Sequence, residues 1–203
     1  SSGALVWCFT TGYSWWMRSS PAVVGGRVYV GSADYKVYCL DTLTGAVVWS
    51  YTTGGDVSSS PAVADGRVYV GSYDRNVYCL NASSGGFIWR YATVTGVTTS
   101  PAVAYGKVYV ENICLDALSG SLVWAGPSAG GSSPAVADGK VYIGGPELGT
   151  GFHCVDAFSG AIIWSYMEGE YGRSFGSPAV ADGKVYVGSS STMSDKAMLI
   201  AFG

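Results

Sequence analysis

The sequence predicts an all-β fold made of repeated four-stranded units, and three observations lead to this prediction. The stretch "SSPAV", or a close variant of it, recurs five times at intervals near 40 residues. Between recurrences, short apolar runs alternate with turns rich in Gly, Asp, Asn and Ser, as tight connections between antiparallel strands require. Repeats of about 40 residues with four short strands each are typical of β-propeller blades. We therefore expect a five-bladed β-propeller of four-stranded antiparallel blades, with about twenty strands and essentially no helix.

The second repeat is the most regular and serves as a template for the others. Its four strands are expected at residues 59–64, 67–72, 76–80 and 87–93. They are separated by "ADG", "YDRN" and "ASSG", which carry the residue types that tight turns favour.

The third and fourth repeats depart from the template in the hairpin between their second and third strands. In the third repeat, Pro101 and Cys114 are separated by 13 positions, which shortens this hairpin by five residues relative to the first two repeats. In the fourth repeat the same turn, "GPELGTGFH", is enlarged. We expect residues 145–152 to lean over the shortened hairpin and to cover Glu111 and Asn112.

The two ends of the sequence predict how the ring closes. Residues 1–9, "SSGALVWCF", match the last strand of a repeat, and the final repeat stops at "MLIAFG", after its third strand. We expect residues 1–9 to complete the fifth blade and so to cover an otherwise open sheet edge. The alternatives are a fragment of a longer ring and exchange of the closing strand between subunits. The expected single domain spans residues 1–203, with blades at 19–58, 59–98, 99–130 and 131–175, and the remainder of the fifth at 176–203.

Most recurring side chains are interpreted as structural. One tryptophan per repeat provides a large flat face for packing between neighbouring sheets; these are Trp7, Trp49, Trp89, Trp124 and Trp164. An aspartate four residues before a glycine suits the capping of turn amides; these are Asp41, Asp116 and Asp156, with Asn81 in the same place in the second repeat. The tyrosines of "VYV" and "VYI" are assigned to the core in the same way.

The five cysteines predict neither disulfides nor a metal site. Cys39, Cys79, Cys114 and Cys154 occupy one position of the third strand, so that equivalent residues on adjacent sheets lie about 10 Å apart, beyond the reach of a disulfide. We expect them to be small buried apolar residues. The only histidine, His153, has no cluster of ligands around it, and we expect it to be a packed or surface residue.

The stretch "AVADGRVYVGSYDRNVYCLNASSGGFIW" resembles the repeat of the pyrroloquinoline-quinone-type (PQQ-like) propellers. "LDTLTGAVVW", "LDALSGSLVW" and "VDAFSGAIIW" are similar to the tryptophan-docking motif of that family, in which Gly follows Asp by four residues and Trp follows by four more. The family includes quinoprotein dehydrogenases, a scaffold lipoprotein of outer-membrane β-barrel assembly, and cell-surface propellers of unknown role. The dehydrogenases and the scaffold are usually eight-bladed, so five blades would be a departure.

Composition and motifs argue against catalysis, nucleic-acid binding and a membrane span. A family dehydrogenase would need acidic and amide ligands for calcium, a catalytic Asp and adjacent cysteines, and none is evident. A glycosidase needs two carboxylates facing one pocket, but the innermost strands read "SPAVV" or "SPAVA"; Glu147, Glu168 and Glu170 lie in loops. The net charge of −3 provides no basic field for nucleic acid, and no apolar run approaches about 20 residues. We expect no enzyme activity, no cofactor and no metal.

The candidate binding site lies on the two longest loops between a fourth strand and the next first strand. Loops of this type emerge together on one face of a propeller, and these two would be neighbours in a closed ring. The first, "YSWWMR", contains Tyr13, Trp15, Trp16 and Arg18; the second, "MEGEYGRSF", contains Glu168, Glu170, Tyr171 and Arg173. Exposed Trp, Tyr and Arg dominate binding hot spots. The alternative is that Trp15 and Trp16 fold inward and plug the mouth of the channel.

Two functions follow from this interpretation. The first is a non-catalytic propeller that recognises a partner protein or a carbohydrate through loops on one face. The alternative is a structural building block of a cell-surface or extracellular assembly, with self-association through strand exchange. Few charges and many Gly, Ser, Thr and Tyr residues suit an extracellular, cell-surface or periplasmic protein. A glycosidase or a quinoprotein is the less favoured alternative.

Overall fold

The structure is a computed structural model that describes residues 3–12, 17–126, 131–145, 151–167, 174–190 and 197–203. These residues form strands and turns and contain no helix, so the all-β, propeller-type prediction is confirmed. By the same token, none of them forms a helix that could cross a membrane. The chain divides into two compact units, residues 1–100 and 101–203.

The first unit contains two four-stranded antiparallel sheets, each with its strands in chain order. The first sheet consists of β1 (Ala22–Val24), β2 (Arg27–Gly31), β3 (Lys36–Asp41) and β4 (Val47–Thr52). The second consists of β5 (Ala62–Ala64), β6 (Arg67–Ser72), β7 (Asn76–Asn81) and β8 (Phe87–Ala92). All four strands expected for the template repeat are present, although β5 begins three residues later than predicted.

The second unit contains three antiparallel sheets. The third sheet consists of β9 (Ala102–Ala104), β10 (Lys107–Val110), β11 (Ile113–Asp116) and β12 (Leu122–Ala125). The fourth consists of β13 (Ala135–Ala137), β14 (Lys140–Gly144), β15 (Phe152–Asp156) and β16 (Ile162–Tyr166). The fifth consists of β18 (Ala179–Ala181), β19 (Lys184–Ser190) and β20 (Ala197–Phe202), with the two-residue β17 (Ser174–Phe175) paired to the end of β19.

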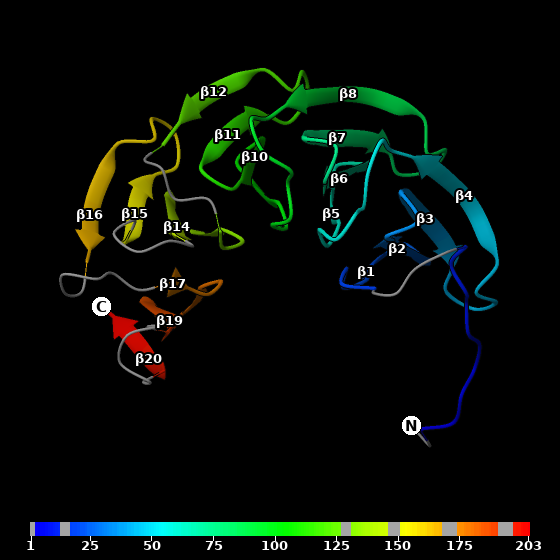
Figure 1. The fold of residues 1–203 in the computed structure, drawn as a ribbon, viewed down its shortest axis with the longest axis horizontal. Helices are drawn as coiled ribbons and strands as arrows, with labels where there is room; N and C mark the ends of the chain where they lie inside the picture. Colours follow the sequence, from blue (N-terminus) through cyan, green and yellow to red (C-terminus); the bar gives the residue numbers. More distant parts are fainter. Residues whose placement is uncertain (1–2, 13–16, 127–130, 146–150, 168–173, 191–196) are drawn as a thin grey trace. The chain divides into compact units, whose positions relative to one another are not determined.

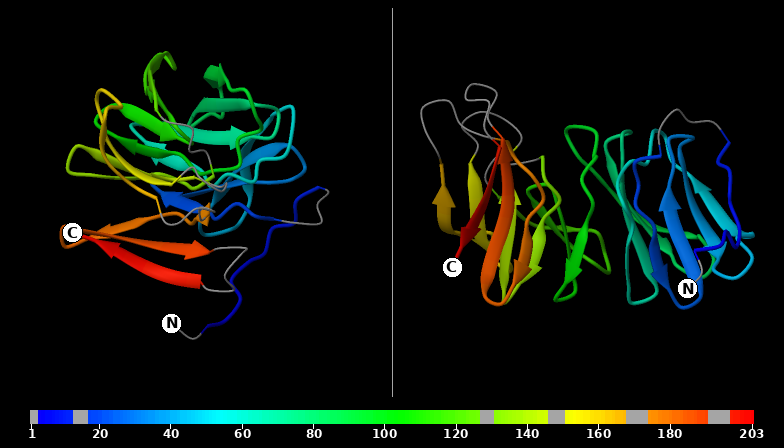
Figure 2. Two further views of the ribbon diagram at one scale, coloured as in Figure 1. Left: turned by 60° about the vertical axis from the view of Figure 1, so that its left-hand side comes forward. Right: turned by 90° about the horizontal axis from the view of Figure 1, so that it is seen from below.

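Within each unit, consecutive sheets approach each other at their first strands. β1 contacts β5 in the first unit, and β13 contacts both β9 and β18 in the second. Figure 1 shows the fourth strands β4 and β8 at the opposite edges of their sheets. The views in Figure 2 show the neighbouring sheets of each unit stacked face to face. One end of each sheet therefore carries the loops from a fourth strand to the next first strand, and the other end carries the turns that follow the first and third strands.

The turns between first and second strands explain the "ADG" pattern. In the second sheet the two central residues, Asp65 and Gly66, have φ angles of 48° and 71°. Positive φ at both positions is the requirement of a two-residue turn whose twist matches the flanking strands. Asp and Gly tolerate this conformation better than β-branched residues do.

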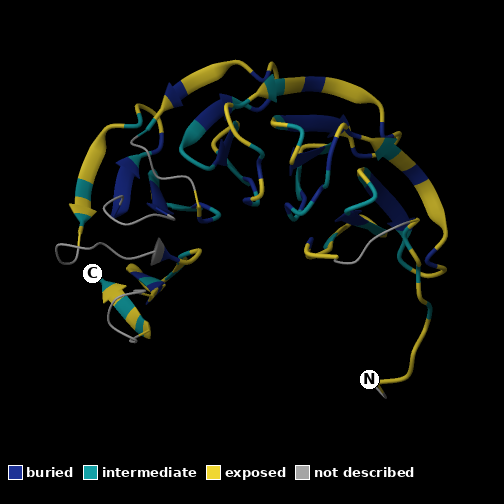
Figure 3. Ribbon diagram, in the orientation of Figure 1, coloured by how far each residue is buried: buried dark blue, intermediate teal, exposed yellow. Residues whose placement is uncertain are grey.

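The core of each sheet comes from its second and third strands. Figure 3 shows these strands largely buried, whereas the outer faces of β4 and β8 are exposed. The four strand cysteines are fully buried and free, which confirms their expected role as apolar core residues. The core tyrosines Tyr29, Tyr69, Tyr109 and Tyr142 are also buried.

The shortened hairpin of the third repeat is confirmed. β10 and β11 are joined directly through Glu111 and Asn112, and Glu111 has a φ of 51°. Burial raises the pKa of the half-buried Glu111 carboxyl. Residues 146–150, which were predicted to cover this hairpin, lie outside the described part of the chain.

The strand predicted for residues 1–9 is not formed where the structure describes it. Residues 3–11 have no strand assignment, although Figure 1 shows an extended segment that leaves the first sheet. Trp7 and Phe9 of this segment pack on Val30 and Tyr38 of the first sheet. Side chains of the segment therefore contact the first sheet, and its pairing with the fifth sheet stays a prediction.

Candidate functional site

Seven of the eight predicted site residues lie outside the described residues; they are Tyr13, Trp15, Trp16, Glu168, Glu170, Tyr171 and Arg173. The eighth, Arg18, is exposed, as is Met17 beside it. The first loop belongs to the first unit and the second loop to the second unit. Their expected proximity stays a prediction, but the anchors of each loop are defined.

The first loop begins on a carboxylate supplied by the turn between β2 and β3. The amide of Gly12, directly before Tyr13, donates a hydrogen bond of 2.8 Å to Asp34 Oδ2. The hydroxyl of Tyr38 donates to the same oxygen at 2.6 Å. Burial raises the pKa of the Asp34 carboxyl, but the hydrogen bonds to it outweigh this effect and leave a net pKa below the usual value. The carboxylate is therefore ionised at neutral pH and holds the start of the loop in place.

The first loop ends on two serines of the "SSPAV" stretch. The hydroxyl oxygen of the buried Ser19 accepts a hydrogen bond from the amide of Gly31 at 2.9 Å. The amide of Ser20 donates to the hydroxyl of Ser60 in the second sheet, also at 2.9 Å. Hydrogen bonds thus hold the chain on both sides of residues 13–18, at Gly12 and at Ser19 and Ser20. Trp15 and Trp16 lie between these two points in the sequence.

The second repeat uses the same anchor for a loop that carries no tryptophan. Asp74 Oδ2 accepts hydrogen bonds from the amide of Gly54 at 2.7 Å and from the hydroxyl of Tyr78 at 2.6 Å. Burial and the Asp74 carboxylate raise the pKa of Tyr78 to about 12. The anchor therefore belongs to the repeat, whereas the indoles are added in the first loop alone.

The second candidate loop, residues 168–173, is anchored at its end by Phe175. This side chain is 4% exposed, and its ring centroid lies 5.6 Å from that of Phe152. The Phe175 amide donates to the carbonyl of Gly145 at 3.2 Å. At the start of the loop, Met167 is 66% exposed.

Sequence reasoning missed the role of the serines before each proline. The first serine accepts from the amide of a glycine in its own sheet, with distances of 2.9, 3.1 and 2.8 Å for Ser19–Gly31, Ser59–Gly71 and Ser132–Gly144. The amide of the second serine donates to the hydroxyl of the second serine in the next stretch, with distances of 2.9, 3.0 and 3.1 Å for Ser20–Ser60, Ser60–Ser100 and Ser133–Ser177. We call the second set the serine ladder. The sequence signal that could have indicated this role is the serine that directly precedes the proline in every repeat.

The predicted cap role of the repeat aspartates is confirmed. Asp41 Oδ1 accepts hydrogen bonds from the amides of Leu43 and Thr44, both at 3.0 Å. Asp116 and Asp156 accept from the amides two and three residues on in the same way. Asn81 does so with its amide oxygen, at 2.9 Å to each partner. The substitution of Asn for Asp therefore preserves the turn.

Some repeat tryptophans have described partners in neighbouring turns and sheets, and their role as a docking motif stays a prediction. The indole NH of Trp7 donates to the carbonyl of Thr42 at 2.9 Å, and that of Trp49 donates to the carbonyl of Ala82 at 2.9 Å. Trp164 instead packs on Phe202 of the fifth sheet, with ring centroids 5.1 Å apart.

Among the described residues, no three His, Cys, Asp or Glu side chains converge as metal ligands. The first strands β1, β5, β9, β13 and β18 read "AVV" or "AVA". His153 is buried, and its Nδ1 lies 2.7 Å from Ser165 Oγ, which agrees with a packed residue.

Comparison with known proteins gives a family match and several structural matches. A family model described as "Outer membrane protein assembly factor BamB" matches residues 1–77, 57–113 and 111–202. No curated protein matches the chain.

Among solved structures, BamB from Moraxella catarrhalis is 20% identical with a TM-score of 0.70, and the match covers 90% of this chain and 60% of that one. A europium-containing methanol dehydrogenase is 18% identical with a TM-score of 0.68, covering 91% and 51%. The quinohemoprotein alcohol dehydrogenase from Comamonas testosteroni is 21% identical with a TM-score of 0.67, covering 85% and 39%. This chain thus spans 60% or less of these structures, and such identities establish the shared fold alone.

Proposed function

We propose, on the premise that this chain belongs to the BamB-type family of PQQ-like repeat β-propellers, that it is a non-catalytic binding propeller. In this proposal it recognises a partner protein or a glycan through loops at one end of its strands. The family description concerns protein assembly, which favours a protein partner. The same description names the outer membrane, which supports a periplasmic, cell-surface or extracellular location.

The observation that carries the proposal is the double anchoring of the first loop. Asp34 fixes Gly12 at its start, and the Ser19 and Ser20 contacts fix its end. A loop whose ends are already ordered loses less entropy when it binds a partner. Two adjacent indoles on such a loop provide the large aromatic area on which binding hot spots are built.

The absence of catalysis is part of the same proposal. The first strands present Ala and Val, and two titratable groups at the loops, Asp34 and Asp74, serve as backbone anchors. Structural neighbours of both kinds, an assembly factor and dehydrogenases, share this fold, so fold alone does not distinguish them. The local use of the charged side chains supports a binding role.

Replacing Trp15 or Trp16 by Ala tests the binding role. We expect each variant to lose binding and to keep the wild-type melting temperature, because the anchors lie outside the substituted positions. Candidate partners are captured from an envelope extract of the source organism and identified by mass spectrometry. The purified candidates are then titrated by interferometry, and a glycan array tests carbohydrates.

Val94→Ala is the matched control for these variants, because Val94 is 92% exposed in the loop that follows β8. It should change neither binding nor stability. If Trp15→Ala and Trp16→Ala mainly lower the melting temperature, the indoles form a plug and the binding site is elsewhere.

A structural building block is the second candidate function, favoured by the exposed edge of the fifth sheet. β20 pairs with β19, and it has no second strand partner among the described residues. Leu199 at this edge is 77% exposed. An unpaired edge can receive a strand from another chain. Light scattering over a range of protein concentrations tests this role; polymers that grow with concentration support it, and a monomer throughout contradicts it.

A further inference from the structure

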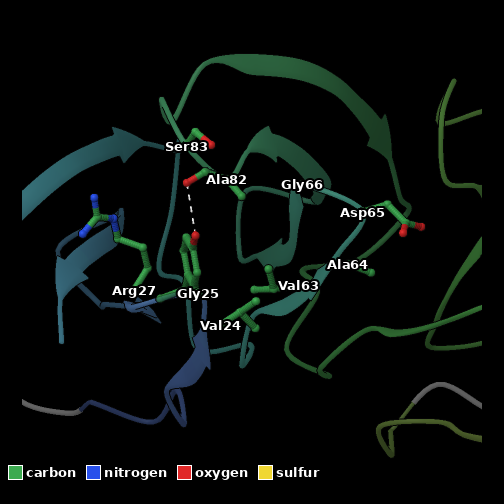
Figure 4. Close-up of a pocket in the computed structure, with 10 residues that line it drawn as sticks. Val24, Gly25, Arg27, Val63, Ala64, Asp65, Gly66, Ala82 and Ser83 are labelled. Atoms are coloured by element: carbon green, nitrogen blue, oxygen red, sulfur yellow. Dashed lines mark hydrogen bonds between the residues drawn. The ribbon is translucent and has the colours of Figure 1, made fainter.

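A pocket of about 340 Å³ opens between the first and second sheets, at the end of the strands opposite to the candidate loops. Its volume lies within the roughly 300–1,000 Å³ range of small-molecule sites. Val24 and Val63 line it beside Tyr29, and Figure 4 shows the two valines close together. The charged ends of Arg27 and Asp65 point away from the valines. The two valines therefore form an apolar wall in a pocket whose lining is otherwise partly polar.

The corresponding place between the third and fourth sheets is occupied by two aromatic side chains, each about half exposed. Tyr105, in the turn between β9 and β10, has its ring centroid 5.4 Å from that of Phe158. Its hydroxyl oxygen accepts a hydrogen bond from the amide of Gly139 at 3.0 Å. The Phe158 ring covers the same glycine, since a Cβ built on Gly139 would lie 3.7 Å from it.

The two places are equivalent because the hydrogen bonds around them are the same. In each, a tyrosine hydroxyl and a tryptophan indole donate to one turn carbonyl. The distances to Ala82 are 3.2 Å from Tyr29 and 2.9 Å from Trp49, and those to Ala157 are 3.1 Å from Tyr109 and 3.0 Å from Trp124. In this alignment Gly25 stands in place of Tyr105, and Ser83 in place of Phe158. The pocket exists because both aromatic rings are missing there.

The polar group that holds the tyrosine is retained in the open pocket. Gly66 stands in place of Gly139, and its amide has no hydrogen-bond acceptor among the described residues. A Cβ built on Gly66 or on Gly25 meets no atom within 4 Å. The open pocket thus combines the apolar wall of Val24 and Val63 with one available amide donor.

We propose that this pocket binds a phenol ring, supplied by a tyrosine side chain on an exposed turn of a partner protein. The ring packs on Val24 and Val63, and its hydroxyl accepts a hydrogen bond from the amide of Gly66. Tyr105, which reaches the equivalent place from a turn of this chain, is the template for this occupant. The site lies at the other end of the strands from the loop with Trp15 and Trp16, so the two binding sites are tested independently.

Nuclear magnetic resonance titration tests the proposal directly. The probes are p-cresol and the blocked tripeptides Gly-Tyr-Gly and Gly-Phe-Gly. We expect saturable shifts of the Val24 and Val63 methyl groups and of the Gly66 amide with p-cresol and the tyrosine peptide. The tyrosine peptide should bind roughly twofold to tenfold more tightly than the phenylalanine peptide, the ratio that one neutral hydrogen bond provides.

Three results of this titration would overturn the proposal. Signals that do not move would show that the pocket binds no phenol ring. Equal binding of the two peptides would remove the role of the Gly66 amide. Binding of p-cresol without the tyrosine peptide would identify a free phenol, not a partner protein, as the ligand.

Two double variants exchange the side chains of the open pocket and of the equivalent occupied place. Gly25→Tyr/Ser83→Phe should fill the pocket and abolish the shifts; Gly25 has a φ of 58° and Tyr105 one of 54°, so the turn accepts tyrosine. Tyr105→Gly/Phe158→Ser should open the second place and create saturable shifts at Val136 and Gly139. Thermal unfolding verifies that both variants are folded. Retained binding in the filled variant, or no gain in the opened one, contradicts the template argument.

Discussion

At the residue scale, a glycine in three of the turns between third and fourth strands lies against a tryptophan that comes from the preceding repeat. A Cβ on Gly85 would lie 2.6 Å from Cδ2 of Trp49, closer than any real contact. Gly45 and Gly160 have the same relation to Trp7 and Trp124, at 2.6 and 2.7 Å. The indole therefore packs directly against the glycine, where a Cβ would leave no room for it. The glycine also supplies the positive φ of the turn, 71° at Gly85.

Gly85→Ala is predicted to destabilise the protein more than Gly66→Ala. Both glycines have a φ of 71°, so each substitution carries the same backbone strain of about 1–2 kcal/mol. Only Gly85 adds overlap with Trp49, which costs typically another 1–3 kcal/mol. Urea unfolding of both variants measures the difference. Equal losses in the two variants would mean that the indole moves aside without cost.

The caps and the packing tryptophans could be predicted from sequence because their cause is local or repeated. Asp41 stands at a fixed distance before its glycine, and the tryptophan recurs in every repeat. The contact of Gly85 with an indole and the open pocket at Gly25 depend on which side chain of a neighbouring repeat lies against them. The spacing of residues within one repeat does not contain this information. Tyr13, Trp15 and Trp16 were singled out by composition, whereas the contacts of Asp34 and Ser19 at the two ends of their loop were not distinguished by the pattern.

At the scale of the element, a half-buried carboxylate ties the hairpin between second and third strands to the preceding loop. Asp34 and Asp74 each accept hydrogen bonds from a tyrosine hydroxyl and a loop amide. Burial raises the pKa of Asp74, and the hydrogen bonds to it lower the pKa by more, to a net value below the usual one. The hairpin and the loop therefore form one folding element, although they belong to different sections of the sequence.

Asp74→Asn is predicted to make the free energy of unfolding less dependent on pH in the acid range. Because the pKa of Asp74 is lower in the folded state, its contribution is fully present above the unfolded pKa of about 3.9 and is lost as the pH falls through the folded value. The free energy of unfolding, measured from about pH 5 downwards, should decline less steeply in the variant than in the wild type. Tyr78→Phe removes one donor and should shift the decline to higher pH. Identical pH profiles for all three proteins would show that the carboxylate stabilises nothing.

At the scale of the whole molecule, the sequence predicts closure by residues 1–9, and the structure specifies what that segment already contacts. Phe9 lies with its ring centroid 5.0 Å from that of Tyr38, and Trp7 packs on the first sheet. Leu5 and Val6 are both 81% exposed. Half of the segment is thus held by the first sheet, and its exposed half presents the apolar surface that pairing with β20 would cover.

Deletion of residues 1–9 is predicted to cause unfolding or oligomerisation. The loss of Trp7 and Phe9 removes side chains whose burial is worth on the order of 1.5–3 kcal/mol each, and closure would add the pairing with β20. Trp7→Ala/Phe9→Ala, which removes only the contacts with the first sheet, is the matched comparison. Calorimetry and light scattering measure both variants. A deletion variant that stays monomeric and is no less stable than the double variant would rule out closure.

The serine ladder also has a consequence for how such a chain changes in evolution. Ser60 accepts a hydrogen bond from the amide of Ser20 in the repeat before it and donates its own amide to Ser100 at the start of the repeat after it. A repeat of this kind carries an acceptor for the repeat before it and a donor for the repeat after it, in the same direction along the chain. A duplicated repeat brings both the amide donor and the hydroxyl acceptor with it. When a repeat is lost, the repeats on either side of it still carry a matching donor and acceptor. Gene duplication can lengthen or shorten the array by whole repeats without inventing a new interface.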